Sequence, residues 1–255
     1  MPEAGTIIRK DIGIVTTGFT SVDNATGIGG YPRGRMTEIF GGSSAGKTAL
    51  AMASCRTAAN AGLLVVWIDL EHSLELKVHT DEPGLRDVLA TAPATAEEAI
   101  DLAAAFLTDI PVDLLVLDSA IAMHPAGASR GLPINAARAE LVGRALRKLT
   151  PLVARRNAVL LFLSRGYLMA APEATASIGG SAPAYYASLR LKLTHEGLRR
   201  HEGEVDAYGV RVRVMKNKLA PPFREAMLYY SFADGTLGEE PPPLVAEPDK
   251  GDSWR

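Results

Sequence analysis

The sequence predicts an α/β protein with a mainly parallel sheet flanked by helices and an antiparallel extension of that sheet. As far as residue 187, short apolar runs alternate with longer helix-compatible segments, which is typical of a parallel sheet covered by helices. Beyond that residue, apolar and polar side chains alternate as they do in half-exposed antiparallel strands. The hydrophobic content of 47% in 255 residues is sufficient for a large core.

The parallel part of the sheet is expected from strand-sized apolar runs and from the helices between them. The predicted parallel strands are residues 37–40, 63–69, 112–118 and 158–164. The predicted helices are residues 47–61, 96–107 and about 135–156. Thr95 and Glu98 have the spacing of a capping box at the start of the second helix. Pro151 lies inside the third helix, which we expect it to kink or split.

The antiparallel extension is expected from three segments late in the chain, residues 188–194, 209–216 and 223–232. Two stretches that contain Gly and Pro without clear periodicity, residues 124–133 and 166–183, each follow a predicted parallel strand. The binding loops of α/β folds lie at such positions. We therefore expect both stretches to carry function.

Composition and charge exclude several classes of protein. The 27 Lys and Arg residues against 29 Asp and Glu give a net charge of -2, so any DNA binding must be local. The apolar runs are far shorter than the ~20 residues that a bilayer requires, so no membrane partner is expected. The single Cys55 excludes a disulfide framework and a Cys-rich zinc site, and the first residues lack the apolar core of a secretory signal. A cytoplasmic location is expected.

The strongest motif is GGSSAGKT at residues 41–48, which satisfies the phosphate-binding pattern G-x-x-x-x-G-K-[ST] between a predicted strand and a predicted helix. Its glycines allow backbone N–H groups to converge on an anion. Lys47 can reach the β and γ phosphates, and the Thr48 hydroxyl can ligate Mg²⁺. The expected nucleotide-binding residues are Gly41, Gly42, Ser43, Ser44, Ala45, Gly46, Lys47, Thr48, Ala49 and Asp118.

Two acidic residues follow apolar strands and complete the expected site. Asp118 is the candidate second acid on the magnesium side, although an Asp at such a place can also cap a helix. Glu71 is the candidate base that activates water. Asp69 and Glu71 would share one face of an extended chain, so that one site could receive both carboxylates. The alternative is that Glu71 and His72 are solvated loop residues.

Five separated motifs together resemble the core of the bacterial RecA recombinases. They lie in the same order within residues 13–235, at residues 16–48, 67–75, 114–122, 179–193 and 212–223. The resemblance implies a RecA-like P-loop ATPase core that uses ATP and Mg²⁺ and binds single-stranded DNA. It also implies self-association in a filament or small oligomer, with the nucleotide between protomers.

The resemblance assigns roles to individual residues as well. Two lysines late in the chain match lysines that reach across to the nucleotide of a neighbouring protomer; by pattern alone they are charges at the end of a strand. The implied catalytic residues are Glu71, Lys47, Lys216 and Lys218, and the implied metal ligands are Thr48 and Asp118.

The expected contacts with DNA come from two loops and one helix. Residues 124–133 and 166–178 match the two DNA-binding loops of the family. The helix predicted after the first loop carries several arginines, which either contact phosphates or form a solvated helix face. The candidate DNA-binding residues are Arg130, Arg138, Arg147, Arg165, Gly179 and Gly180.

The chain departs from the family pattern at three positions. Ser164 and Arg165 stand where the family carries Asn-Gln, whose glutamine couples the nucleotide to the second DNA loop. Val78 stands in place of the tyrosine that stacks on adenine. We therefore expect altered coupling between the nucleotide and the second DNA loop, and weaker binding of the adenine base.

We divide the chain into an N-terminal segment (1–34), an ATPase core (35–236) and a Pro-rich tail that is expected to be disordered (237–255). Within the first segment, Ile7 and Ile8 of the sequence GTIIR could dock a strand on the next protomer's sheet. The alternative is a local edge strand or a frayed terminus.

Three functions fit these residues. The first is a DNA-stimulated ATPase that acts on single-stranded DNA in repair or recombination. The second is an accessory RecA-like protein of the ImuA type, which supports damage-induced translesion synthesis by binding RecA or a translesion polymerase. The third is a P-loop ATPase without a DNA role. Lys216, Lys218 and residues 179–188 favour the first two, whereas Arg165 and the short termini favour the second over the first.

Overall fold

The computed structural model describes residues 12–72, 84–119, 122, 134–168, 175–177, 181–201 and 204–242. Within them the helices are α1 (Thr20–Thr26), α2 (Lys47–Asn60), α4 (Ala96–Asp109), α5 (Ile134–Arg156) and α6 (Ala182–Tyr186). None of the helices in this part of the chain combines the length and the apolar character needed to cross a bilayer.

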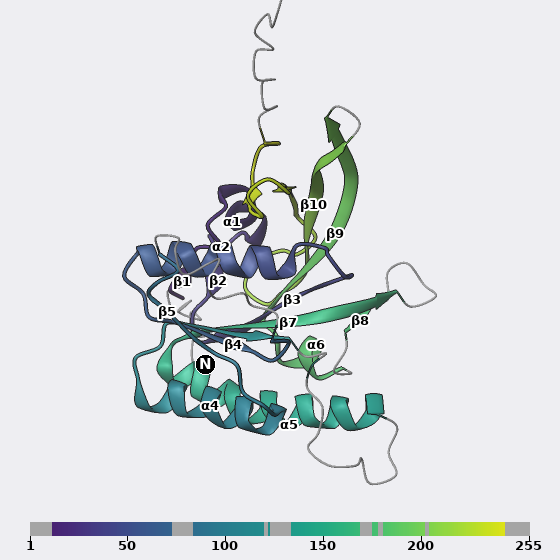
Figure 1. The fold of residues 1–255 in the computed structure, drawn as a ribbon. Coiled ribbons are helices and arrows are strands. Elements are labelled where there is room, and N and C mark those ends of the chain that lie inside the picture. The colour runs from purple at the N-terminus through teal and green to yellow at the C-terminus, as the bar shows by residue number, and fades with distance from the viewer. Residues whose placement is uncertain are drawn as a thin grey trace, which may run out of the picture.

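A ten-stranded sheet forms the centre of the molecule (Figure 1). Its strands are β3 (Arg35–Gly41), β4 (Val65–Asp69), β5 (Val88–Thr91), β6 (Leu114–Asp118), β7 (Val159–Leu168), β8 (Thr175–Ser177), β9 (Leu189–His201), β10 (Glu204–Asn217), β11 (Glu225–Ser231) and β12 (Leu237–Gly238). The main order is β12-β11-β10-β9-β3-β7-β6-β4-β5, and β8 pairs with β7 outside this path. A separate pair is formed by β1 (Ile14–Val15) and β2 (Tyr31–Pro32).

The two predicted parts of the sheet are both confirmed. From β9 through β3, β7, β6 and β4 to β5, every neighbouring pair is parallel. On the other side of β9, the strands β10, β11 and β12 pair antiparallel. Strand β9 therefore joins the two parts, and the long β9–β10 hairpin extends away from the parallel strands (Figure 1).

The helices cover both faces of the sheet, with α2 on one face and α4 and α5 on the other (Figure 1). Side chains of β7 alternate between the two faces because successive residues of a strand point to opposite sides. Val159, Leu161 and Leu163 belong to the core that contains α2, whereas Leu160 and Phe162 belong to the core that contains α4 and α5. Both cores are apolar, which is why the parallel strands are nearly continuous apolar runs.

Two expectations about helix ends have different outcomes. The Thr95 hydroxyl accepts the Glu98 backbone N–H at 3.1 Å, which confirms the cap of α4. Helix α5 instead continues through Pro151, so the expectation of a split is wrong, while the alternative of a kink stays a prediction. Pro151 is exposed near the end of the helix, and its ring therefore displaces no packed side chain. The buried Leu149 and Val153 hold the helix against the core on either side of the proline.

Both ends of the described chain pack with the sheet. Val15, Phe19, Val22 and Tyr31 lie in the same hydrophobic core as α2, although they precede residue 35, where we placed the start of the ATPase core. At the other end, β12 begins at Leu237, which is 8% exposed and pairs with Tyr230. The sheet thus continues slightly past residue 236.

Candidate nucleotide-binding site

The phosphate-binding motif forms the turn between β3 and α2, as its pattern requires. Gly41 has no room for a side chain, because a Cβ atom there would overlap the carbonyl oxygen of Leu193 on β9. Gly46 has φ +86°, a conformation that favours glycine, and no side chain caps α2 at this position. The first N–H groups of α2 are thus not capped by a side chain, an arrangement that suits an anion such as a phosphate.

Lys47 lies over this turn. Its ammonium donates a hydrogen bond to the Gly42 carbonyl oxygen at 2.6 Å. Burial lowers the pKa of Lys47, the carboxylates of Asp118 and Glu71 oppose this effect, and the charge of Arg165 lowers the pKa further. The electrostatic contacts show that four charged groups from four separate segments converge on the turn. Together with the uncapped helix, the two cations fit the negative charge of a polyphosphate.

Asp118, at the end of β6, and Thr48, in the first turn of α2, face each other. The Thr48 hydroxyl donates to Asp118 Oδ2 at 3.2 Å. Burial raises the pKa of Asp118 to about 7, the charges of Glu71 and Asp69 act in the same direction, and the Thr48 hydrogen bond and Lys47 oppose them. A nearby divalent cation would stabilise the ionised carboxylate.

The same pair fits Mg²⁺ as a ligand set. Mg²⁺ is commonly bound by one or two carboxylates together with water and phosphate oxygens, so a protein does not need to provide a full cage. In the described residues no three His, Cys, Asp or Glu side chains come together as a metal cluster. The hydroxyl of Thr48 and the carboxylate of Asp118 would therefore hold the ion together with the phosphates.

Glu71 reaches the site by a turn and not by an extended chain. Its backbone N–H donates to Asp69 Oδ1 at 3.0 Å, and His72 has φ +50°. The expectation that residues 69 and 71 share one face of an extended strand is therefore wrong, because β4 ends at Asp69 and the chain turns there. Glu71 is exposed, accepts a hydrogen bond from the Ser119 hydroxyl, and acts electrostatically on both Lys47 and Asp118.

A pocket of about 670 Å³ adjoins the phosphate-binding turn on the side of the antiparallel strands. Its far wall is aromatic: His195 stacks on Tyr208 with ring centroids 4.6 Å apart, and Tyr208 stacks on Tyr230 at 5.0 Å. Phe232 extends this wall, and the Tyr208 hydroxyl donates to the Ser44 carbonyl oxygen at 3.0 Å. A pocket of this size with an aromatic wall fits a flat heterocycle.

Sequence reasoning missed this aromatic wall. Tyr208 and Tyr230 are direct cross-strand partners in the β10–β11 pair, so they meet only when that register is known. The available signal was the presence of aromatic residues at corresponding places in two predicted neighbouring strands. That signal would have suggested a shared face, but not its position beside the phosphate-binding turn.

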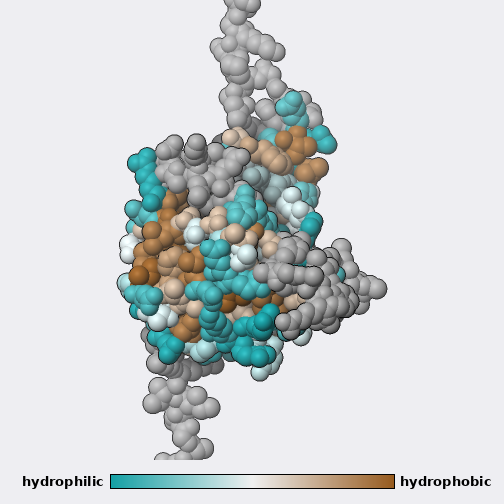
Figure 2. Space-filling model, turned by 60° about the horizontal axis from the view of Figure 1, so that its bottom comes forward, coloured by the Kyte–Doolittle hydropathy of each residue, from teal (hydrophilic) through white to brown (hydrophobic). Residues whose placement is uncertain are grey.

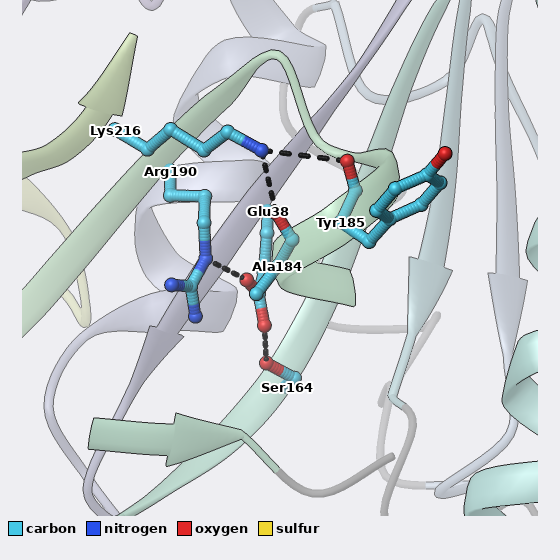
Figure 3. A network of polar contacts seen from close by, with 6 residues as sticks. All are labelled: Glu38, Ser164, Ala184, Tyr185, Arg190 and Lys216. Carbon is cyan, nitrogen blue, oxygen red and sulfur yellow. Dashed lines mark hydrogen bonds and ion pairs between the residues drawn. The ribbon is translucent and has the colours of Figure 1, made fainter. Parts of the chain in front are cut away.

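Lys216 lies on β10, is half-buried, and reaches the carbonyl groups of α6 (Figure 3). Its ammonium donates to the Ala184 carbonyl oxygen at 2.5 Å and to that of Tyr185 at 3.4 Å. Burial lowers the pKa of Lys216, Lys218 and Arg190 act in the same direction, and Glu38 opposes them. Lys218 is exposed.

A buried polar network lies near Lys216 (Figure 3). Glu38 on β3 is fully buried and accepts hydrogen bonds from the Ser164 hydroxyl at 2.6 Å and from Arg190 Nε at 2.5 Å. The Arg190 guanidinium also lies 4.4 Å from the centre of the Phe40 ring. The buried carboxylate of Glu38 is thus paired with a cation, as a buried charge requires. Because Glu38, Ser164 and Arg190 lie on β3, β7 and β9, their hydrogen bonds link these three strands.

The candidate DNA contacts differ in exposure. Arg147 is exposed on α5, whereas Arg138 is 7% exposed and donates to Asn135 Oδ1 at 3.3 Å. Figure 2, turned toward α4 and α5, shows hydrophilic residues over this face with a hydrophobic area at its left. Outside the described residues lie Arg130, Gly179, Gly180, Val78, the proposed docking strand at 5–9, residues 124–133 and most of residues 166–178.

Comparison with known proteins gives one consistent result. Residues 3–237 match the family described as the RecA N-terminal domain. Protein RecA of Methylococcus capsulatus is 36% identical over 240 residues, which are 90% of this chain and 68% of that protein. Protein RecA of Syntrophus aciditrophicus is 37% identical over 240 residues, or 89% and 68%. Protein RecA 1 of Myxococcus xanthus is 34% identical over 245 residues, or 92% and 71%.

Proposed function

The chain belongs to the RecA family, and from this premise we propose that it binds and hydrolyses ATP with Mg²⁺ in an assembly on single-stranded DNA, in DNA repair or recombination. The observation that carries the proposal is the convergence of Lys47, Thr48, Asp118 and Glu71 on one uncapped helix end. Phosphoryl transfer needs groups that bind the phosphates, hold Mg²⁺ and orient water, and these four residues would supply all three.

The chemistry follows from the positions of these groups. The backbone N–H groups at the start of α2 and the Lys47 ammonium would bind the phosphates, and Thr48 and Asp118 would hold Mg²⁺. The ion would neutralise the charge that develops on the leaving phosphate. Glu71 is exposed beside the turn, so its carboxylate would accept a hydrogen bond from the attacking water and orient it.

The aromatic pocket supports a nucleotide over a simple phosphate ester. Tyr208 and Tyr230 would stack on the base, because aromatic rings stack on any flat π system. Tyr208 also hydrogen-bonds to Ser44 within the phosphate-binding turn, so the base and phosphate sites are mechanically joined. Val78 replaces the family tyrosine at another position, and this wall would supply the stacking that Val78 cannot.

Assembly is proposed from two features at opposite sides of the sheet. Lys216 and Lys218 would reach the nucleotide of a neighbouring protomer, as the family resemblance implies. Strand β5 lies at the edge of the sheet, with Leu89 47% exposed and one side of its backbone unpaired within the described chain. Residues 5–9 of a neighbour, GTIIR, would add to such an edge by β-strand pairing.

DNA binding is proposed for the family's two loops and for the exposed Arg147. An exposed arginine would contact the phosphate backbone without reading sequence. The accessory alternative is not favoured by the comparisons, since the relatives cited above are each named RecA.

The proposal is tested by phosphate release from ATP with and without single-stranded DNA, with particle size measured in the same samples. Turnover stimulated by DNA, together with larger particles when ATP is present, is the expected result. Turnover that does not change when DNA is added, with no DNA binding at low salt, would leave a P-loop ATPase without a DNA role. The Lys47→Ala variant serves as the control for contaminating ATPases.

A further inference from the structure

We propose that Tyr208 is a positioning residue of the site: by holding the Ser44 carbonyl group, its hydroxyl keeps the turn between β3 and α2 in the conformation that binds polyphosphate. The inference rests on the proposed function, because it needs the phosphates of a nucleotide on that turn. It gives the Tyr208 hydroxyl a role toward the phosphates that is separate from the stacking role of the ring.

The backbone of Ser44 needs support from its surroundings. Ser44 has φ +54°, in the left-handed region that residues other than glycine rarely adopt. It stands inside the phosphate-binding motif, between Gly42 and Gly46. A serine keeps this conformation only when other groups hold it, because a negative φ is otherwise lower in energy. If Ser44 relaxed, the N–H groups of the turn would no longer converge on one anion.

A hydrogen bond from a distant strand holds this residue. Tyr208 lies on β10, and its hydroxyl donates to the Ser44 carbonyl oxygen at 3.0 Å, across 164 residues of sequence. Tyr208 is only 6% exposed, so little of its side chain faces water. Burial raises the pKa of Tyr208, and Tyr230 acts in the same direction. The hydroxyl therefore keeps its proton and remains a donor.

Aromatic neighbours fix the direction of the Tyr208 ring. His195 on β9 stacks on this ring with the centroids 4.6 Å apart, and Tyr230 on β11 stacks on it at 5.0 Å. Phe232 lies against the ring at 5.5 Å. A ring that is packed by residues from both neighbouring strands presents its hydroxyl at a defined place before a ligand binds.

The pairing of β9 with β10 changes register at Tyr208. Tyr208 is the partner of Leu198, whereas Gly209 is the partner of Glu196, so Gly197 is an extra residue on β9. Gly197 has φ +56°, as expected for the glycine of a β-bulge. Bulges redirect side chains next to active sites, and this one adjoins the residue that reaches the phosphate-binding turn.

A second contact from β10 supports the other end of the motif. Because successive residues of a strand alternate between its faces, Tyr208 and Val210 lie on the same face of β10. A Cβ atom at Gly46 would come within 3.3 Å of a methyl group of Val210, so Val210 packs close to that glycine. Strand β10 thus meets the turn at both Ser44 and Gly46, and the hydrogen bond of Tyr208 joins the strand to the strained residue.

The test uses Tyr208→Phe, which keeps the ring and removes the hydroxyl. Affinities for inorganic tripolyphosphate and for a β,γ-imido analogue of ATP, each with Mg²⁺, are measured by competition against a fluorescent ATP analogue. We expect both affinities to fall about fivefold, as for the loss of one hydrogen bond, because both compounds place phosphates on the turn. Ser44 is exposed, so water can replace the hydroxyl at its carbonyl oxygen and the variant should fold.

Tyr229→Phe is the matched control. Tyr229 directly precedes Tyr230 on β11, so its side chain points to the opposite face of the sheet from the aromatic wall. This variant also removes one tyrosine hydroxyl from the antiparallel strands, and it should change neither affinity.

A second background, Ser44→Gly, separates positioning from a general effect on the fold. Glycine adopts a positive φ without strain, so the turn of this variant does not depend on Tyr208 to keep its shape. Adding Tyr208→Phe to Ser44→Gly should therefore change the tripolyphosphate affinity less than twofold. A loss of the same size in both backgrounds would overturn the inference, because the hydroxyl would then act by another route.

Two further results would overturn the inference. One is a Tyr208→Phe chain that binds tripolyphosphate as the wild type does, and the other is a loss confined to the ATP analogue, which would mean that the hydroxyl acts on the base. Failure of the proposed function is distinguished by Lys47→Ala. If Lys47→Ala binds both compounds normally, the turn is not the phosphate site and both proposals fall. If Lys47→Ala loses both while Tyr208→Phe binds them normally, the proposed function stands and the inference falls.

Discussion

The ammonium of Lys216 lies 2.5 Å from the carbonyl oxygen of Ala184 in the last turn of α6. Carbonyl groups at the end of a helix are unpaired and partly negative, so they hold a cation well. A lysine bound there is not available to bind a phosphate. In the single chain, Lys216 is therefore satisfied within its own protomer, and reaching a neighbour's nucleotide requires it to leave α6.

The first prediction concerns this lysine. Lys216→Ala should bind ATP within about twofold of the wild type, because the isolated phosphate-binding turn is unchanged, but should lose the part of ATP turnover that rises with protein concentration. Specific activity is measured over a wide range of protein concentrations with single-stranded DNA. Arg213→Ala on the same strand is the control and should keep the rise. A wild-type activity that does not depend on concentration would contradict completion of the site by a neighbour.

The second prediction separates binding from chemistry. Lys47→Ala should lose most nucleotide affinity, because it removes the ammonium over the turn, whereas Glu71→Gln should bind ATP and hydrolyse it at least tenfold more slowly. A fluorescent ATP analogue reports binding, and phosphate release reports turnover. Normal turnover by Glu71→Gln would remove Glu71 from the mechanism.

The third prediction follows from the pKa of Asp118, which burial raises from 3.8 to about 7. Because the folded chain keeps a proton that the unfolded chain releases, this carboxyl contributes stability below about pH 4, and that contribution is lost as the pH rises through 7. The difference corresponds to about 4 kcal/mol. Without nucleotide or Mg²⁺, Asp118→Asn should therefore raise Tm at pH 8 and change it much less at pH 4.5.

Thermal unfolding in the presence of EDTA measures this effect at both pH values. The same Asp118→Asn variant should bind ATP more weakly when Mg²⁺ is present, since the amide is a poorer ligand than the carboxylate. Equal destabilisation at pH 4.5 and pH 8 would show that Asp118 is an ordinary structural residue. A higher Tm at pH 8 together with weaker ATP binding would show that Asp118 serves ligand binding at a cost in stability.

The fourth prediction tests the aromatic wall. Tyr230→Ala should weaken ATP binding about fivefold, as expected for about 1 kcal/mol of lost stacking, and should leave the affinity for inorganic tripolyphosphate unchanged. Competition of both compounds against a fluorescent nucleotide measures this difference. Met227→Ala on the same strand, where the side chain is 37% exposed, is the control. A parallel loss of tripolyphosphate affinity would mean that Tyr230 acts on the phosphate-binding turn and not on the base.

The fifth prediction concerns DNA. Arg147→Ala should weaken binding of single-stranded DNA uniformly across sequences and reduce the slope of log K against log salt by about 0.7. Lys148→Ala is the matched control, because Lys148 is already paired with Asp101 at 2.6 Å and should contribute less. Binding is measured by fluorescence anisotropy at several salt concentrations. An unchanged slope for Arg147→Ala would show that Arg147 belongs to a solvated helix face.

The sequence by itself determined the phosphate-binding turn, the strands on each side of it and the side of the sheet on which the acids lie. These features depend on short-range patterns: the spacing of glycines and Lys47, the apolar runs of buried strands, and the Asp at the end of β6. The helix cap at Thr95 was determined in the same way, because its hydrogen bond joins residues three apart.

The tertiary structure alone decided which residues distant in the sequence meet. Tyr208 and Tyr230 meet through the register of β10 and β11, Arg165 reaches the turn through its pairing with Gly41, and Lys216 is held by α6. Strand order, register and pleat phase fix these contacts, and they follow from the packing of the whole sheet between its two cores. A linear pattern carries none of that information, because each partner is separated from the other by at least 22 residues in the chain, as for Tyr208 and Tyr230.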